Sequence, residues 1–355
     1  MQRLLIVGGS ESHTGGSEHF IRRSSEALRR RGGWKVETMP TNSAYLSAST
    51  IKPYLSSLVS LLRRSKGFDH LWVQYGSFPD LAFVVLARLT GCDVIVTPHL
   101  GTNWRSQSSP ILRYISQWAI GFADRVAIFS ETQQAELGLS NLPITRIRTF
   151  LPEESLDPVQ AEQPTGATKR LVHAARLSEE KGSFLMIDVC ARLKQANVPF
   201  SAEIIGGADE VTLERLQRKI QESGLGGEVS LHGHMPVPDL LRRVRSADFL
   251  VHLSKMDSYP LVVLEALTCS TLPICLDLPG ARHMIETYDG YVVDSSRSAE
   301  AAAAIIIDLN VKEARARAEK AASRVIADYN WSSAGELLEK ALETTQLAVG
   351  TNRAR

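Results

Sequence analysis

Short runs of β-branched and aliphatic residues alternate with longer amphipathic stretches along most of the chain, and this alternation limits its fold more than any other feature. Parallel strands covered by helices on both faces produce such a pattern, because two parallel strands need a long crossover between them. We expect strands in the first half at residues 3–7, 35–39, 70–74, 94–97 and 125–129, with helices that begin near Ser17, Pro53, Pro79 and Pro110.

The periodicity disappears between Pro152 and Lys169, a stretch rich in Pro, Glu and Gln that is typical of an interdomain linker. A second series of strands follows, at residues 170–174, 201–205, 229–232, 249–253, 272–276 and 290–293, with helices near Ser183, Asp209, Pro238, Leu261 and Ser298. The 355 residues also exceed what one hydrophobic core usually holds. We therefore expect an α/β protein of two Rossmann-like, doubly wound domains, residues 1–160 and 161–325, with a C-terminal helix in 326–355 that crosses back to the first domain.

Composition excludes several classes of protein. The 44% hydrophobic and 22% charged fractions are those of a globular protein, and no apolar run reaches the length of a membrane-spanning helix. The first residues lead directly into a strand without a secretory signal, and the four scattered cysteines are expected to be buried thiols. These features predict a cytoplasmic protein without a metal site.

Charge is distributed unevenly. The first 150 residues contain 17 Lys and Arg against 10 Asp and Glu, and the remainder contains 23 against 29. The segment from Lys52 to Gly67 combines leucines with four basic residues, a pattern found in helices that lie on a membrane surface. Peripheral contact with the inner face of an anionic membrane and an ordinary solvated helix face both remain open for this segment.

A glycine-rich loop follows the first expected strand. Gly8, Gly9, Gly15 and Gly16 precede a helix, and glycines allow a backbone to approach a phosphate near free helix amides. The spacing matches neither a dinucleotide fingerprint nor a Walker loop, so a tight turn explains it equally well.

Two cations follow the strand at 170–174. Arg176 and Lys181 would lie at the carboxyl end of that strand, the edge where open parallel sheets bind ligands. Together they could neutralise a diphosphate, or simply pair with Glu179 and Glu180.

Two acids flank a proline in HLSKMDSYPLVVLEAL. Pro260 suits a helix start, so Leu261 and Val262 would offer backbone amides to a phosphate. Glu265, one turn further, could accept hydrogen bonds from a ribose diol, and Asp257 could reach a second sugar. Ordinary helix-start and loop acids would show the same pattern.

Together these motifs resemble glycosyltransferase family 4, the retaining enzymes of the GT-B fold, also described as glycosyl transferases group 1. The resemblance spans nearly the whole chain and rests on Gly15–Gly16–Ser17–Glu18, the run from Arg176 to Gly182, the Asp257-to-Glu265 segment, and VTPHLG with His99. Gly206, Gly233 and Ser130 lie in further similar segments.

The resemblance implies a role for each matched residue. Gly16, Arg176 and Lys181 would contact the donor diphosphate, Glu265 would hold the ribose, and Asp257 and His99 would lie beside the transferred sugar. Leu261, Val262, Gly206 and Gly233 would complete the nucleotide site, and Gly15, Glu18 and Ser130 would lie on the acceptor side. The chain departs from the family in having Asp257 where a glutamate is usual and His283 where another glutamate commonly stands.

The expected activity is retaining, metal-independent transfer of a hexosyl group from a UDP- or GDP-linked sugar to a glycan or lipid-linked acceptor, in cell-surface polysaccharide or glycolipid synthesis. No cofactor and no nucleic acid partner is expected. A nucleotide-sugar epimerase on the same fold and a non-catalytic nucleotide- or carbohydrate-binding protein remain as alternatives.

Overall fold

The computed structural model describes residues 1–10, 15–43, 46–47, 50–99, 109–138, 142–156 and 168–343. The chain forms two compact units, one from Met1–Phe150 with the segment that begins at Tyr329, the other from Leu151–Asp328. The sequence predicted these divisions at 160/161 and 325/326. Most of the expected linker lies outside the described residues.

The first unit is built on a six-stranded parallel sheet of order β2-β1-β3-β4-β5-β6. Its strands are β1 Gln2–Val7, β2 Trp34–Met39, β3 His70–Tyr75, β4 Asp93–Pro98, β5 Arg125–Ile128 and β6 Ile144–Arg146. Its helices are α1 Gly16–Arg31, α2 Ile51–Arg64, α3 Leu81–Ala87, α5 Pro110–Ile120, α6 Glu131–Leu137 and α15 Trp331–Glu343, with 3-10 turns η1 Ser65–Gly67, η2 Phe78–Asp80 and η3 Arg88–Thr90.

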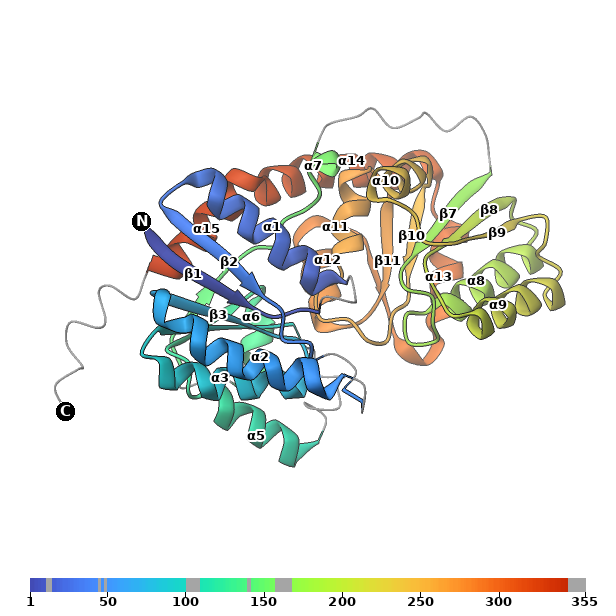
Figure 1. Cartoon of the computed structure of the whole chain (residues 1–355). Helices are drawn as coiled ribbons and strands as arrows, with labels where there is room; N and C mark the ends of the chain where they lie inside the picture. The colour runs from blue at the N-terminus through green and yellow to red at the C-terminus, as the bar shows by residue number, and fades with distance from the viewer. Residues whose placement is uncertain are drawn as a thin grey trace. The chain divides into compact units, whose positions relative to one another are not determined.

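Alternation along β1 separates two cores, one on each face of this sheet. Leu4 and Ile6 belong to the cluster beneath α1 and α15, whereas Leu5 and Val7 belong to the cluster beneath α2 and α3. Figure 1 shows α1 and α15 on one face and α2, α3 and α5 on the other. The side-chain period of two in a strand explains this division.

The second unit repeats the plan with a six-stranded parallel sheet of order β12-β11-β10-β7-β8-β9. Its strands are β7 Lys169–Ala174, β8 Phe200–Ile205, β9 Val229–His232, β10 Phe249–His252, β11 Leu272–Leu276 and β12 Tyr291–Val293. Its helices are α7 Glu153–Leu156, α8 Ser183–Gln195, α9 Glu210–Glu222, α10 Val237–Ser246, α11 Leu261–Thr268, α12 Pro279–Tyr288, α13 Ser298–Asp308 and α14 Val311–Tyr329, with the 3-10 turn η4 Ser295–Arg297.

Each sheet has one point where the strand order reverses. In the first unit this switch point lies between β1 and β3, and in the second between β7 and β10. In open α/β sheets, ligands bind outside the carboxyl ends of the strands at such a point. The topology therefore singles out the loops after β1, β3, β7 and β10.

The sequence analysis missed several elements. It did not predict the three-residue edge strand β6, the short helices α6 and α7, or α12, whose first residues Pro279 and Gly280 suggest a turn. Gly280 is needed there because a Cβ would lie 1.8 Å from the Ser258 carbonyl oxygen. The glycine marks a close approach of two backbones.

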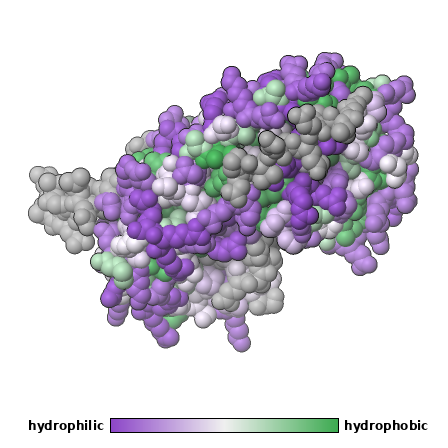
Figure 2. Space-filling view, turned by 90° about the horizontal axis from the view of Figure 1, so that it is seen from above, coloured by the Kyte–Doolittle hydropathy of each residue, from purple (hydrophilic) through white to green (hydrophobic). Residues whose placement is uncertain are grey.

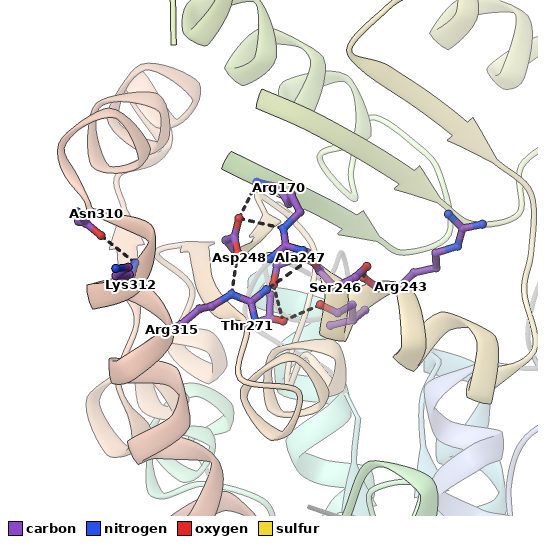
Figure 3. A network of polar contacts seen from close by, with 10 residues as sticks. Arg170, Arg243, Ser246, Ala247, Asp248, Thr271, Asn310, Lys312 and Arg315 are labelled. Carbon is purple, nitrogen blue, oxygen red and sulfur yellow. Dashed lines mark hydrogen bonds and ion pairs between the residues drawn. The ribbon is translucent and has the colours of Figure 1, made fainter. Parts of the chain in front are cut away.

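A buried ion network closes the amino edge of the second sheet (Figure 3). The Asp248 carboxylate is fully buried and accepts hydrogen bonds from the Arg170 backbone amide at 2.8 Å and guanidinium at 3.1 Å, and from Arg315 Nε at 2.7 Å. Asp248 thereby joins β7, β10 and α14.

Candidate functional site

The central part of the candidate site lies at the switch point of the second sheet, where the loops after β7 and β10 run side by side. The Lys255 backbone amide donates to the Glu180 carbonyl at 2.7 Å, which ties the two loops together. Gly182 has a φ of +79°, and a Cβ there would lie 2.4 Å from the Leu253 carbonyl oxygen. Only glycine allows both this backbone conformation and this approach.

The site brings together Lys181 and Asp257, which are far apart in the sequence. Lys181 Nζ lies 2.8 Å from Asp257 Oδ2 and donates to the Met256 carbonyl, also at 2.8 Å. The two side chains are 24% and 19% exposed, so the pair is accessible from solvent. A mobile cation and a carboxylate are thus held at the edge where the topology predicts a ligand.

His252 is a further member of this cluster. Its Nε2 lies 3.3 Å from Asp257 Oδ2, so Lys181 and His252 contact the same carboxylate oxygen. Burial by itself raises the pKa of Asp257, but the His252 hydrogen bond and the Lys181 charge outweigh it and hold that pKa below its usual value. Asp257 is therefore ionised at neutral pH.

His173 supports the cluster from β7. Its ring stacks on that of His252 with centroids 6.4 Å apart, and it donates from Nδ1 to the Val251 carbonyl oxygen at 2.9 Å. The Ser183 hydroxyl lies 3.1 Å from the other ring nitrogen. Burial lowers the pKa of His173 to about 4, so the imidazole is neutral at physiological pH.

Sequence reasoning assigned no role to either histidine. His252 is the first residue of the HLSKMD motif and His173 stands near the end of β7, so both were visible as polar residues at expected strand ends. A lone histidine in an apolar strand gives no indication of its partner, because the contact depends on the register of β7 beside β10.

The expected ribose ligand lies on α11. The helix begins at Leu261 after Pro260, which places Leu261 and Val262 in its first turn and Glu265 about one turn further on. Glu265 is half-buried. First-turn amides of a helix lack intrahelical acceptors and are therefore suited to an anion.

Arg176 and Gly206 lie beside each other at the ends of β7 and β8. Arg176 is exposed, and a Cβ on Gly206 would lie 1.7 Å from the neighbouring Ala175 carbonyl oxygen. Gly206 therefore permits the loop that carries Arg176 to cross β8 closely. Gly233, after β9, is exposed, and a Cβ there would meet no atom within 4 Å.

In the first unit, the expected glycine motif forms the start of α1. Glu18 Oε2 accepts hydrogen bonds from the Gly15 amide at 2.9 Å and the Ser17 hydroxyl at 3.0 Å, which makes Glu18 a capping residue. Gly16 is exposed as the first helical residue. Residues 11–14 of this loop lie outside the described part of the chain.

His99 and Ser130 follow β4 and β5 at the same edge of the first sheet. His99 Nε2 lies 2.8 Å from Gln74 Oε1, and its ring contacts those of Phe20 and Phe129. Burial lowers the pKa of His99 to about 4, so it too is neutral. Ser130 is buried and precedes α6, with its hydroxyl 2.9 Å from that of Thr132.

Within the described ranges, no three His, Cys, Asp or Glu side chains are grouped so that they could hold a metal ion. The described part of the chain likewise has no helix long and apolar enough to cross a membrane. All four cysteines are free thiols, and three of them are buried.

Known proteins resemble the chain at the level of both fold and family. Anabaena HepE in complex with UDP and glucose superimposes with a TM-score of 0.74 at 15% identity, over 97% of this chain and all of that one. This likeness and the two parallel sheets define a protein of the GT-B fold. Residues 159–325 match the family described as "Glycosyl transferases group 1".

Two curated relatives illustrate the family match. The alpha-D-kanosaminyltransferase of Streptomyces kanamyceticus is 23% identical over 276 residues, 72% of this chain and 71% of that protein. The amylovoran biosynthesis glycosyltransferase AmsK of Erwinia amylovora is 30% identical over 153 residues, 41% of this chain and 37% of that protein. Residues 159–325 are thus a glycosyl transferases group 1 domain, and the expected resemblance to family 4 is confirmed.

Proposed function

We propose that the chain is a retaining hexosyltransferase, which moves a sugar from a nucleoside-diphosphate donor to a glycan or lipid-linked acceptor. Cell-surface polysaccharide or glycolipid synthesis is the proposed setting, and the AmsK relative supports it. One observation carries the proposal: Lys181 and Asp257 lie 2.8 Å apart at the switch point of a glycosyl transferases group 1 domain.

The proposed donor is a UDP- or GDP-linked sugar held by the second unit. Negative charge develops on the departing diphosphate, and Lys181, Arg176 and the first amides of α11 are suited to stabilise it. Two cations and a helix start supply the charge that a divalent ion would otherwise provide, so we propose metal-independent transfer. Complexes of HepE with UDP and glucose support a UDP-linked donor.

Asp257 is proposed to read the hydroxyls of the transferred sugar. Lys181 and His252 both contact Oδ2, and these contacts fix the orientation of the carboxylate. An ionised carboxylate accepts hydrogen bonds from sugar hydroxyls without donating any. The side chain is one methylene shorter than the usual glutamate, so it is the proposed source of donor preference.

The first unit is proposed to contribute the acceptor site and part of the donor site, with domain boundaries close to those predicted from the sequence. The exposed Gly16 is suited to approach the diphosphate, and the neutral His99 can exchange hydrogen bonds with the sugar without adding charge. Gly15, Glu18 and Ser130 are proposed for the acceptor side.

The membrane interpretation of residues 52–67 also remains part of this proposal. On α2, Ile51, Leu55 and Val59 are exposed at a spacing of four residues, and the exposed Lys52, Arg63 and Lys66 accompany them. Apolar side chains flanked by cations are suited to the surface of an anionic membrane. Such contact would place the active site near a lipid-linked acceptor.

Thermal denaturation with UDP, GDP, ADP and their sugars tests the donor assignment, because a ligand that binds only the folded state raises the melting temperature. Turnover is then measured with the identified donor. We expect Lys181→Ala to lower kcat at least about 100-fold, the scale on which a single transition-state donor acts. Lys194→Ala is a matched control. Lys194 lies on α8, and its Nζ forms an equally short ion pair with Glu228, at 2.8 Å.

Normal turnover by Lys181→Ala would show that the assignment of this cation is wrong. Product analysis without acceptor separates the alternatives, since an epimerase would convert the donor sugar and leave it attached to the nucleotide. Binding of a nucleotide without transfer to any of a panel of acceptors would instead favour a binding protein.

A further inference from the structure

Helix α5 places its large apolar side chains in solvent. Ile111 is 73% exposed, Tyr114 70%, Ile115 38% and Trp118 55%. Their spacing of three, four and seven residues puts them on one stripe of the helix. We call these four residues the α5 apolar stripe.

The buried side of α5 carries fewer large apolar residues than the exposed stripe. Ser116 is buried, donates to the Leu112 carbonyl at 2.8 Å and lies 3.0 Å from the Tyr75 hydroxyl. Ala119 and Ile120 are also buried. A helix that only covers a core has the reverse arrangement, with its large apolar residues inward.

On the face drawn in Figure 2, hydrophilic residues predominate and hydrophobic ones form small groups.

The elements that carry and flank the α5 apolar stripe are basic. α5, the helix α3 that packs on it, and the adjoining α2 and η3 have no Asp or Glu within their bounds, and together they contain Lys52, Arg63, Arg64, Arg88 and Arg113. Arg64 pairs with Glu37 at 3.0 Å and Arg88 with Asp124 at 3.2 Å, both acids lying outside these elements. Leu89, between α3 and β4, adds a side chain that is 75% exposed. Anionic lipid headgroups attract such a surface, and bilayers accept Trp and Tyr at their interface.

We propose that the α5 apolar stripe inserts into the interfacial region of an anionic membrane, with Trp118 and Tyr114 as its anchors. The eleven residues of α5 are too few to span a bilayer, so the helix would lie in the plane of the surface. The inference goes beyond the proposed contact of α2, and it is independent of the chemistry of sugar transfer.

Vesicle flotation tests the proposal with liposomes of phosphatidylcholine, alone or mixed with phosphatidylglycerol. The full chain should bind the mixed vesicles, and Ile111→Ser with Trp118→Ser should weaken that binding at least about tenfold, because two large apolar side chains no longer enter the bilayer. Val211→Ser on α9 is the matched control, since Val211 is 66% exposed but lies beside Glu210. Melting temperatures within about 2 °C of the unaltered chain would show that the fold is intact.

Two further measurements check how deeply Trp118 enters the bilayer and whether a membrane or a second copy of the chain covers the α5 apolar stripe. Brominated phosphatidylcholine in the anionic vesicles should quench fluorescence of the unaltered chain more than that of Trp118→Phe, which keeps an apolar ring and should still float. The inference is overturned if the chain does not bind anionic vesicles, if the double variant binds as well as the unaltered chain, or if only Leu55→Ser with Val59→Ser on α2 loses binding. Light scattering that shows a dimer lost in the α5 variant, without vesicle binding, would instead identify a second copy as the occupant.

Discussion

Two aspartates flank the same strand of the second unit and have opposite surroundings. Asp248 precedes β10 and is fully buried between Arg170 and Arg315, whereas Asp257 follows β10 and is 19% exposed beside Lys181 and His252. Arginine offers Asp248 a rigid fork with several donors, but Lys181 offers Asp257 one ammonium on a flexible chain. The first network is built to remain closed, and the second can exchange partners.

The position of each network in the sheet accounts for this difference. Asp248 lies at the amino edge, where its backbone amide bonds to the Arg170 carbonyl at 2.7 Å and fixes the start of β7. Asp257 lies at the carboxyl edge, where the strand order reverses and ligands bind. Identical side chains therefore serve stability at one end of the strand and, in the proposed function, recognition at the other.

Removal of Asp248 should produce the largest effect. Asp248→Ala leaves Arg315, which is 5% exposed, without its carboxylate, so we expect the free energy of unfolding to fall by about 3–5 kcal/mol. Urea denaturation measures the change. Asp239→Ala, which breaks an exposed pair with Arg242, should cost about 1 kcal/mol or less. Similar losses for both variants would contradict a structural role for Asp248.

Removal of Asp257 should affect catalysis more than folding. We expect Asp257→Ala to lower kcat/KM for the identified donor about 100-fold, which corresponds to about 2.7 kcal/mol of transition-state stabilisation. Its urea midpoint should move much less than that of Asp248→Ala. Asp257→Glu should retain turnover but change the ranking of donor sugars. If the ranking of donor sugars is unchanged in Asp257→Glu, Asp257 does not set the donor preference.

Acid should destabilise the fold through His173, the buried histidine that stacks on His252. Its pKa is about 4 in the folded chain against 6.5 ordinarily, so the unfolded chain binds more protons between these values and the free energy of unfolding falls as the pH drops below 6.5. At pH 5 this loss should reach about 2 kcal/mol from His173 alone. His173→Gln should therefore reduce the slope of stability between pH 6.5 and 5 and leave it unchanged between pH 7 and 8. An identical acid slope in both chains would contradict the buried neutral imidazole.

His252 should have the smallest effect of the four, because it acts through Asp257. His252→Gln is expected to lower kcat about tenfold, or about 1.4 kcal/mol, by loosening the carboxylate. In a double-mutant cycle, His252→Gln should add little to Asp257→Ala, since the residue it positions is already gone. Fully additive losses would show that His252 acts independently of Asp257.

Local pattern was sufficient for most of the fold. Every strand of the second sheet was predicted, because buried parallel strands are short apolar runs separated by amphipathic helices. Among the elements that were missed, α12 begins with Pro279 and Gly280, and the need for a glycine there arises only from the Ser258 carbonyl beside it. The motifs with Lys181, Asp257 and Glu265 were likewise visible, because their residue types and spacing are local features.

The sequence by itself therefore determined two doubly wound units, the family of the second, and the loops where a ligand is expected. Tertiary structure alone decided which charges meet: that Lys181 and His252 share one oxygen of Asp257, and that Arg315 closes the network of Asp248. It also decided that α5 turns its apolar stripe outward, since helical periodicity shows that a stripe exists but not which side faces the core. The physical reason is the same in each case, because such contacts depend on the register and packing of segments far apart in the chain.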